Sequence, residues 1–405
     1  MKKKRMKSYL NRALALNLAV MLGMTAAGCG KEAIWENMGK QDVSAEYAES
    51  VQDMEAMAAT GRYVEQFADL PENSGGPGQA MALLEEGKLA YFDGHTSCYS
   101  AEVEALFAED ADWKMIQDFP ELKETYIGHS AIAKDGSLAL ICEEFTEEDI
   151  KVTLYVTDSV QNEYKIDGKF TDGDYIGRLF WKEPGELYGV SVRGRVCQIN
   201  LQEQKMEQLF LGSGSPETLA FSENMLFALE NEGIEIFDLS TKEKVESDSV
   251  LDEFCKEQFK GMLGASSGSV GAILMPQKDD ILYLACESGL YRHVLGGAAI
   301  EEVMDGQMSV LGDPMTGLCN MEALADGTFV LLYTGGKMVR IVYDPDASAF
   351  PEQQLNVYSL YENDRIRQAI QLYGQKNPQV YVNYEIGIPD ESGVTLEDAQ
   401  KNLNM

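Results

Sequence analysis

Three histidines are the first candidates for metal or acid–base chemistry in this 405-residue chain. They are His95, His129 and His293, and their spacing does not match that of metal ligands. We predict structural or surface roles for all three, with no metal site and no cofactor. The sequence has no phosphate-binding loop, no Gly-x-Ser-x-Gly elbow and no dinucleotide fingerprint, so we also predict no catalytic residues. A pair of carboxylates acting on glycans stays open, because such a pair is defined by its separation in space.

Thiols and carboxylates offer two further kinds of chemistry. Asp172 and Asp174, in the segment DGKFTDGD, could hold calcium, but an ordinary acidic turn is favoured because the spacing of a full calcium loop is missing. Six cysteines occur inside the chain without any Cys-x-x-Cys spacing, mostly within apolar runs: Cys98, Cys142, Cys197, Cys255, Cys286 and Cys319. We predict that they are free and buried, with disulfide pairing as the alternative for an exported chain.

The seventh cysteine, Cys29, ends an N-terminal segment that is typical of export. A basic stretch is followed by about 12 apolar residues, whereas a membrane-spanning helix needs about 20. Ala26-Ala27-Gly28-Cys29 resembles the lipobox of bacterial lipoproteins, with alanine where leucine is usual. The resemblance implies a signal peptide over 1–28, lipid on Cys29 and a position on the outer face of the cytoplasmic membrane. The alternative is an ordinary signal peptide with an incidental cysteine.

The charge of the chain limits its partners. It carries 67 acidic and 33 basic residues, a formal net charge of −34. A surface this acidic repels phosphate backbones, so nucleic acid is excluded as a main partner. Solubility at an extracellular face is the favoured explanation, and attraction of cationic ligands is the alternative. Residues 29–60 are polar, with little periodicity, and we predict a tether.

A recurring unit organises most of the chain. A short turn leads into an apolar run, a second turn and another apolar run, and this unit recurs with a spacing of roughly 48 residues. Its leading turns are at Gly87, Gly136, Gly185, Glu223-Asn224, Asp279-Asp280 and Gly327. Such units bury both faces only by neighbouring one another in a ring. We therefore predict a mainly β fold, with a β-propeller over 61–350.

The repeats predict six blades, with seven as the alternative if a blade is hidden in Glu102–Glu121. Leu251–Ser269 is an insertion between the fourth and fifth units. Arg62–Leu70 is a strand ahead of the first full unit, and we predict that it completes the last blade and closes the ring.

The character of the sequence changes in 351–405. Leu355–Leu360 is a predicted strand, and Asn363 caps a helix with an apolar stripe at Ile366, Ala369, Ile370 and Tyr373. Val380–Ile386 is a second strand, and Thr395–Leu403 starts another helix. This β-α-β order predicts the beginning of an α/β domain with a parallel sheet.

Residues 355–387 resemble the start of an extracellular solute-binding protein of the sugar-type importer class, here preceded by a propeller. The resemblance implies that the loop after the first strand lines a ligand cleft through Ser359, Tyr361, Glu362 and Asn363; packing and capping by Tyr361 and Asn363 is the alternative. Because the pattern stops after the first β-α-β, we interpret this domain as truncated and expect the unit to be poorly folded or to lean on the propeller.

These observations favour a non-enzymatic surface lipoprotein. Its propeller would bind or act as a scaffold, and the domain it begins would serve nutrient uptake, with carbohydrate as the expected solute and an importer permease as a partner once the domain is complete. The alternatives are a secreted glycan-active hydrolase or lyase, marked by carboxylates or a Tyr-Glu pair on the ring axis, and a purely structural envelope propeller.

Overall fold

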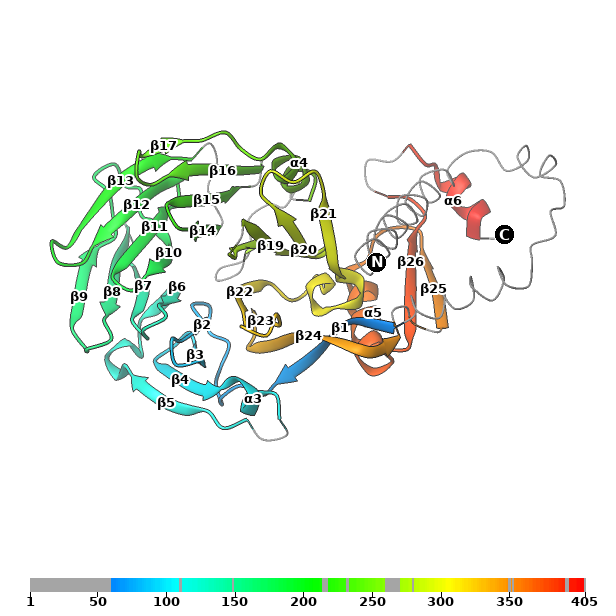
Figure 1. Ribbon diagram of the computed structural model, residues 1–405, viewed down its shortest axis with the longest axis horizontal. Coiled ribbons are helices and arrows are strands. Elements are labelled where there is room, and N and C mark those ends of the chain that lie inside the picture. The colour runs from blue at the N-terminus through cyan, green and yellow to red at the C-terminus, as the bar shows by residue number, and fades with distance from the viewer. Residues whose placement is uncertain are drawn as a thin grey trace, which may run out of the picture. The chain divides into compact units, whose positions relative to one another are not determined.

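The computed structural model describes residues 60–108, 111–147, 149–212, 218–230, 233–258, 270–278, 280–348, 351, 353–389 and 393–403. All of these belong to one compact unit. The predicted signal peptide, Cys29 and the tether up to residue 59 lie outside the described residues. The chain is mainly β: six four-stranded antiparallel sheets surround a common centre and form a six-bladed β-propeller (Figure 1).

Each sheet is one blade, and in the first five blades the strands follow one another from the centre outward. Blade 1 contains β2 (Ala80–Leu83), β3 (Lys88–Phe92), β4 (Ser97–Glu102) and β5 (Lys114–Asp118), and blade 2 contains β6 (Tyr126–Ile132), β7 (Leu138–Phe145), β8 (Ile150–Thr157) and β9 (Glu163–Asp167). Blade 3 contains β10 (Ile176–Glu183), β11 (Glu186–Ser191), β12 (Arg195–Asn200) and β13 (Lys205–Leu211). Blade 4 contains β14 (Thr218–Ser222), β15 (Met225–Glu230), β16 (Gly233–Asp238) and β17 (Glu243–Lys244), and blade 5 contains β18 (Ala272–Pro276), β19 (Ile281–Cys286), β20 (Gly289–Val294) and β21 (Ile300–Asp305).

Blade 6 is built from both ends of the propeller sequence. Its strands are β22 (Leu318–Ala323), β23 (Phe329–Tyr333), β24 (Lys337–Ser348) and β1 (Thr60–Ala68). β1 runs antiparallel to β24, with Ala68 opposite Met338. This pairing confirms that the strand ahead of the first repeat closes the ring. The strand was predicted to run to Leu70, but its pairing with β24 ends at Ala68. Ala68 lies opposite Met338, and β24 begins only one residue before Met338.

The repeated turns of the sequence join the first and second strands of the blades. Six residues at this position have positive φ: Gly87 (79°), Gly136 (86°), Gly185 (83°), Glu223 (48°), Asp280 (58°) and Gly327 (82°). Four of them are glycine, which enters this left-handed region without steric cost. The repeat detected in the sequence is therefore one turn geometry used once in every blade.

The core is divided among the contacts between neighbouring blades. Six clusters of buried apolar side chains are found, and each draws its residues from two consecutive blades, including blades 6 and 1. The innermost strand of each blade also contacts the innermost strands of the blades on either side. A single blade buries its faces only between two others, which explains why the ring must close.

The stretch that could have hidden a seventh blade does not form one. The stretch Glu102–Glu121 contains the short helix α3 (Val103–Leu106), β5 and the start of the 3-10 turn η1 (Pro120–Leu122). It therefore supplies the outer strand of blade 1. The expected insertion after blade 4 begins as helix α4 (Ser249–Gln258), and residues 259–269 lie outside the described part.

Beyond blade 6 the chain forms the predicted β-α-β unit. β25 (Gln353–Ser359) and β26 (Val380–Ile386) pair in parallel, joined by α5 (Asp364–Lys376), and α6 (Leu396–Leu403) follows. Asn363 caps α5 as expected. Two further 3-10 turns, η2 (Gly306–Met308) and η3 (Val310–Gly312), lie between blades 5 and 6. Within the described residues, every helix is too short or too polar to cross a bilayer.

Candidate functional site

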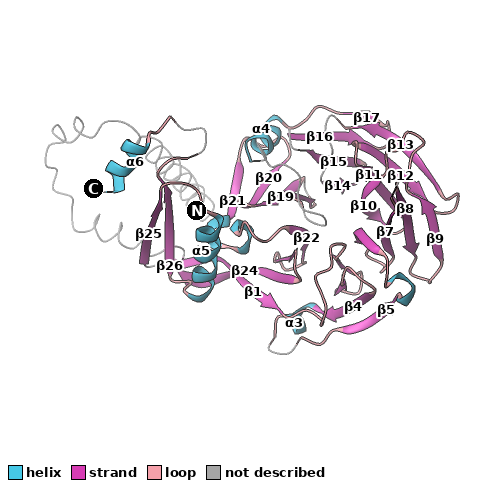
Figure 2. Ribbon diagram, turned by 180° about the vertical axis from the view of Figure 1, so that it is seen from behind, coloured by secondary structure: helices cyan, strands magenta, loops and turns pink. Residues whose placement is uncertain are grey.

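The inner strands of the six blades surround the axis of the ring (Figures 1 and 2). They line a cavity, here called the central channel. Its volume is about 560 Å³, which falls in the usual range of roughly 300–1,000 Å³ for small-molecule sites. Each inner strand is the free edge of its sheet, and some of its backbone groups pair with side chains of the next blade, as the Met81 N–H does with Asn320 Oδ1. The wall of the channel thus contains hydrogen-bonding groups from the backbone as well as from side chains.

Aromatic and thioether side chains form part of the channel wall. Phe180, Trp181 and Phe221 line it, together with Met275 and Met321. The Trp181 indole N–H donates to the backbone carbonyl of Ala131 at 3.0 Å. This bond holds the ring in a fixed orientation between blades 2 and 3, so the channel presents preformed apolar surfaces.

Charged side chains line the same cavity. Glu322 on β22 accepts a hydrogen bond from the Leu83 N–H, and burial raises its pKa to about 7, although Lys134 partly counters that shift. The Lys134 ammonium also lies 3.8 Å from a carboxylate oxygen of Glu183. Glu85 lines the cavity as a second carboxylate. The channel thus combines a carboxyl that is protonated near neutral pH with a second acidic group and an ammonium.

His129 is part of the channel wall and has a structural hydrogen bond. Its Nδ1 lies 3.3 Å from the Leu179 N–H, which donates to it. Burial, with a smaller contribution from Arg178, lowers the His129 pKa to about 3. The imidazole is therefore neutral at neutral pH, and its proton is on Nε2. The prediction of a structural role agrees with this bond.

The second buried histidine, His293, joins blade 5 to helix α4. Its Nε2 is 3.0 Å from Asp248 Oδ2, and its Nδ1 is 3.0 Å from the carbonyl oxygen of Ala299. Asp248 also accepts from the N–H groups of Val250 and Leu251 at the start of α4. The pair is almost fully buried, so His293 is structural, as predicted. His95 instead lies in an exposed turn, where its N–H donates to Asp93.

The segment proposed as a weak calcium candidate is occupied by arginine. Arg195 pairs with Asp172, and its Nε lies 3.5 Å from Asp174 Oδ2. An ordinary acidic turn held by an ion pair is therefore what the structure shows. The six cysteines at 98, 142, 197, 255, 286 and 319 are free, as predicted. Burial is confirmed for five of them, whereas Cys319 is only partly buried.

The predicted ligand residues of the β-α-β unit lie together at the C-terminal end of β25. The Ser359 hydroxyl donates to the Tyr361 carbonyl at 2.5 Å and lies 2.7 Å from the Tyr384 hydroxyl. Tyr361 is 59% exposed. Glu362 accepts from Arg367 at 3.1 Å, and the Asn363 side chain accepts from the first N–H groups of α5. The structure therefore brings all four into one loop, where three already have protein partners.

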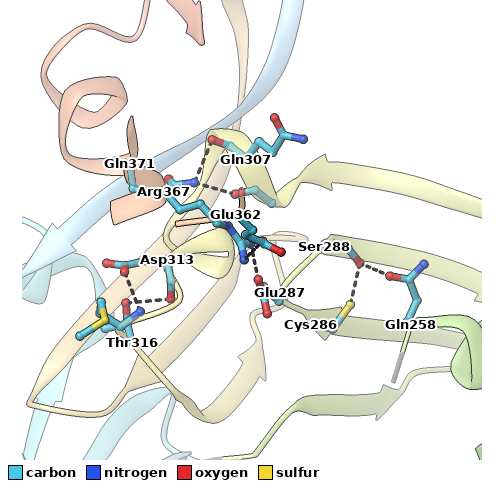
Figure 3. A network of polar contacts seen from close by, with 12 residues as sticks. Gln258, Cys286, Glu287, Ser288, Gln307, Asp313, Thr316, Glu362, Arg367 and Gln371 are labelled. Carbon is cyan, nitrogen blue, oxygen red and sulfur yellow. Dashed lines mark hydrogen bonds and ion pairs between the residues drawn. The ribbon is translucent and has the colours of Figure 1, made fainter. Parts of the chain in front are cut away.

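The β-α-β unit contacts the propeller through α5 (Figure 3). The Gln371 amide donates to the carbonyls of Gly306 and Gln307 in η2, at 3.2 and 2.9 Å. Arg367 pairs with Glu287 in the turn between β19 and β20 as well as with Glu362 (Figure 3). The expectation that this unit would lean on the propeller is confirmed.

The predicted apolar stripe of α5 is buried only in part. Gln371 is its only buried residue within the described chain, whereas Ala369 is exposed and Tyr373 is 41% exposed. The stripe prediction holds in part, because Ile366 and Ile370 are half-buried, but the most buried position is Gln371, which donates to a backbone carbonyl of η2.

The channel residues were not identified from the sequence. The detectable repeat starts at the turn after each inner strand, so the inner strands fall outside it. A signal does exist: Glu85, Lys134 and Glu183 each precede the turn glycine of their blade by two residues. Aligning the repeats on their turns would have placed these charges at one end of the ring.

No protein-family model matches the chain, and no curated protein matches it. Solved structures show a distant likeness. The chain is similar to a gluconolactonase from Xanthomonas campestris (TM-score 0.42, 11% identity, 71% of this chain and 97% of that one). It is also similar to YCF48 bound to D1 peptide (0.41, 11%, 70% and 97%) and to a chain of the mitotic checkpoint complex (0.39, 11%, 79% and 90%). At such low identity no function carries over to this chain.

Proposed function

We propose that this chain is a membrane-anchored extracellular binding protein whose central channel holds a carbohydrate without turning it over. The observation that carries the proposal is the mixed wall of the channel, where Trp181 and Phe221 share one cavity with Glu322, Lys134 and Asn320. Aromatic faces pack against the C–H faces of a sugar ring, and carboxyl, ammonium and amide groups pair with hydroxyls. A solute that is apolar on its faces and polar on its edges fits such a wall.

The two ends of the chain complete this proposal. Lipid on Cys29 would hold the propeller at the outer face of the cytoplasmic membrane, with the predicted tether of residues 29–60 between them. The β-α-β unit would begin a solute-binding domain for nutrient uptake, and an importer permease would be its partner once the domain is complete. Ser359, Tyr361, Glu362 and Asn363 would line the cleft of that domain, at the carboxyl end of β25.

A second candidate function is glycan hydrolysis in the same channel. The observation that favours it is that Glu85 and Glu322 both line the cavity, and burial raises the pKa of Glu322 to about 7. A carboxyl whose pKa lies near neutral pH is suited to act as a general acid, with a second carboxylate as its partner.

Calorimetric titration of the full chain with a panel of oligosaccharides, beside product analysis of the same mixtures, separates the two. Binding with unchanged sugar supports the binding protein, and release of shortened sugar supports the hydrolase. Trp181→Leu should weaken binding by about tenfold or more, the effect of losing one stacked ring. Glu322→Gln should reduce turnover strongly if Glu322 is the acid, and should only modestly change binding otherwise. No binding by any member of the panel would refute the carbohydrate proposal.

The anchor is tested separately. Intact-mass analysis of the exported protein should show a diacylglyceryl group, and Cys29→Ala should release the protein from the membrane fraction. An unmodified Cys29 in a soluble exported chain would leave the channel proposal standing and refute the anchor.

A further inference from the structure

A second cavity lies between the ring-closing strand β1 and the β-α-β unit. Its volume is about 430 Å³, and its walls come from β1, η2, α5 and β26. Gln371 and Gln307, whose hydrogen bond is drawn in Figure 3, form part of one wall. This cavity is distinct from the central channel, because none of the residues that line one of them lines the other.

Three aromatic rings and one glutamate line this cavity. The rings belong to Tyr63, Phe67 and Tyr381, and the carboxyl belongs to Glu65. The faces of aromatic rings carry partial negative charge and attract cations, most strongly where water is excluded. Aromatic faces beside one carboxylate are the combination that recognises ammonium groups with apolar substituents.

The protein offers the Glu65 carboxylate few groups that would stabilise its negative charge. Its Oε1 accepts one hydrogen bond, from the Val310 N–H at 2.7 Å, the only hydrogen bond to this carboxyl among the described residues. Burial raises its pKa to about 7, and the Val310 hydrogen bond and Lys337 offset this only in part. A bound cation would supply the missing charge and stabilise the carboxylate.

The surroundings of the cavity are also acidic. Asp344 lines it, and Glu302 and Asp305 lie close enough to Tyr381 to contribute, after burial, to the raised pKa of that hydroxyl. Arg62 is the one basic side chain in the wall of the described chain, and its guanidinium donates to the carbonyl of Pro378 at 2.7 Å. The net charge of −34 adds a long-range attraction for cations.

We propose that this second cavity binds a small organic ammonium ion, with a quaternary head of the choline type as its best fit. The ammonium head lies against Tyr63 and Tyr381 beside the Glu65 carboxylate, and the apolar substituents contact the methionines of the wall. This inference does not depend on the function of the central channel.

Titration calorimetry of the full chain with choline tests the proposal. The matched ligand is 3,3-dimethylbutan-1-ol, which has the same shape without the charge. We expect choline to bind at least about tenfold more tightly than this alcohol, because only the cation gains from the carboxylate and the rings. Glycerophosphocholine, which adds a phosphodiester, distinguishes a lipid head group from a free solute: tighter binding than choline indicates the lipid source, and weaker binding indicates the free ion.

Two glutamates with similarly raised pKa values provide a matched pair of variants. Glu65→Gln should weaken choline binding by about tenfold or more, whereas Glu322→Gln, in the other cavity, should leave choline binding unchanged. Tyr381→Leu should also weaken it while circular dichroism shows a folded propeller. Saccharide binding should instead be weakened by Trp181→Leu in the central channel and left unchanged by Glu65→Gln, so failure of one proposal is distinguishable from failure of the other.

The pH dependence gives an independent readout. Lys337 and Tyr333 are the titratable groups that interact with the Glu65 carboxyl, Asp313 acts on the Tyr333 hydroxyl, and Tyr63 lies two residues away on the same strand. Choline affinity should rise with pH and level off above about 7, because Glu65 must lose its proton to pair with the cation. Equal affinities for choline and the neutral alcohol, or choline binding unaffected by Glu65→Gln, would overturn the proposal.

Discussion

Arg340 in β24 of blade 6 forms a two-bond fork with Glu104 in α3 of blade 1. Its Nη1 and Nη2 lie 3.1 and 2.9 Å from the two carboxylate oxygens. The same guanidinium reaches Asp326 at 2.8 Å, and its side chain is only 7% exposed. The last blade is thus joined to the first by a polar clamp as well as by the apolar cluster between them.

Arg340→Met should lower the free energy of unfolding by about 1 kcal/mol or more, because the buried guanidinium is lost and Asp326 and Thr328 lose a donor, while the largely exposed Glu104 contributes less. Urea denaturation followed by tyrosine and tryptophan fluorescence measures this. Arg193→Met is the matched control, since its pair with Asp172 is exposed and 3.8 Å long, and it should change stability by less than about 0.5 kcal/mol. Equal effects of the two substitutions would contradict a role for the fork in ring closure.

Glu322 should make the protein less stable as the pH rises. Its folded-state pKa is about 7, above the usual 4.5, so between these values the folded protein holds a proton that the unfolded chain has released. Stability therefore decreases with pH across this interval. Glu322→Gln should remove this loss and be more stable than the parent by about 1 to 2 kcal/mol at pH 8, with little difference at pH 4. The comparison is made by urea denaturation at both pH values.

The exposed Glu203 provides the control for that experiment. Its side chain is 62% exposed, and Glu203→Gln should follow the parent at both pH values. The difference in unfolding free energy between the parent and Glu322→Gln should change between pH 5 and pH 8. If it is the same at both pH values, the folded channel does not raise the pKa of this carboxyl.

Asp248 should contribute stability that is lost in acid. Burial acts to raise its pKa, but hydrogen bonds from His293 and from the N–H groups of Leu251 and Gly296 outweigh burial and lower it. The stabilisation is therefore present above the ordinary pKa of an aspartate and is lost as the pH falls through the lowered value. Each ring nitrogen of His293 lies 3.0 Å from an oxygen, Nε2 from Asp248 Oδ2 and Nδ1 from the Ala299 carbonyl.

Two substitutions separate the charge of Asp248 from its role as a helix cap. Asp248→Asn can still cap α4 and should lose about 1 kcal/mol, whereas Asp248→Ala should lose about 2 kcal/mol or more. Thermal unfolding at pH 7 measures the difference. If the two variants are equally stable, the hydrogen bonds that Asp248 accepts from the first N–H groups of α4 do not contribute to stability.

Gln371 should hold the β-α-β unit against the propeller. Gln371→Ala removes both hydrogen bonds to the carbonyls of η2, so amide exchange in β26 should accelerate by about tenfold while exchange in β8 stays unchanged. Lys376→Ala, at an exposed position of the same helix, is the control. Hydrogen exchange followed by mass spectrometry gives both readouts, and unchanged exchange in β26 after Gln371→Ala would contradict the anchoring role.

The ring of blades could be predicted from the sequence because a single local device recurs. The turn after each inner strand needs positive φ, and glycine supplies it at Gly87, Gly136, Gly185 and Gly327. The apolar runs that follow are buried on both faces and are therefore continuous in the sequence. The closing strand β1 could also be identified, because the sequence shows one strand ahead of the first unit that belongs to no unit of its own.

The sites were harder to predict, because they depend on distant parts of the chain meeting. Glu322 and Lys134 share a cavity only after the ring has closed, and the pKa of Glu65 is raised by burial that the folded chain provides, with the Val310 N–H of η3 offsetting part of that shift. The buried face of α5 was missed for a related reason. Its neighbour is a set of backbone carbonyls around Gly306, which no hydrophobic pattern in the helix records.

Blade 6 also sets the order in which the molecule can be assembled. β1 leaves the ribosome first but finds its partner only after residues 337–348 of β24 have been made, nearly 280 positions later. Until that moment one flank of blade 1 has no neighbour, so every nascent intermediate displays an apolar surface. Chaperone capture of such chains, or swapping of β1 between two copies, is the hazard built into this way of joining the ends.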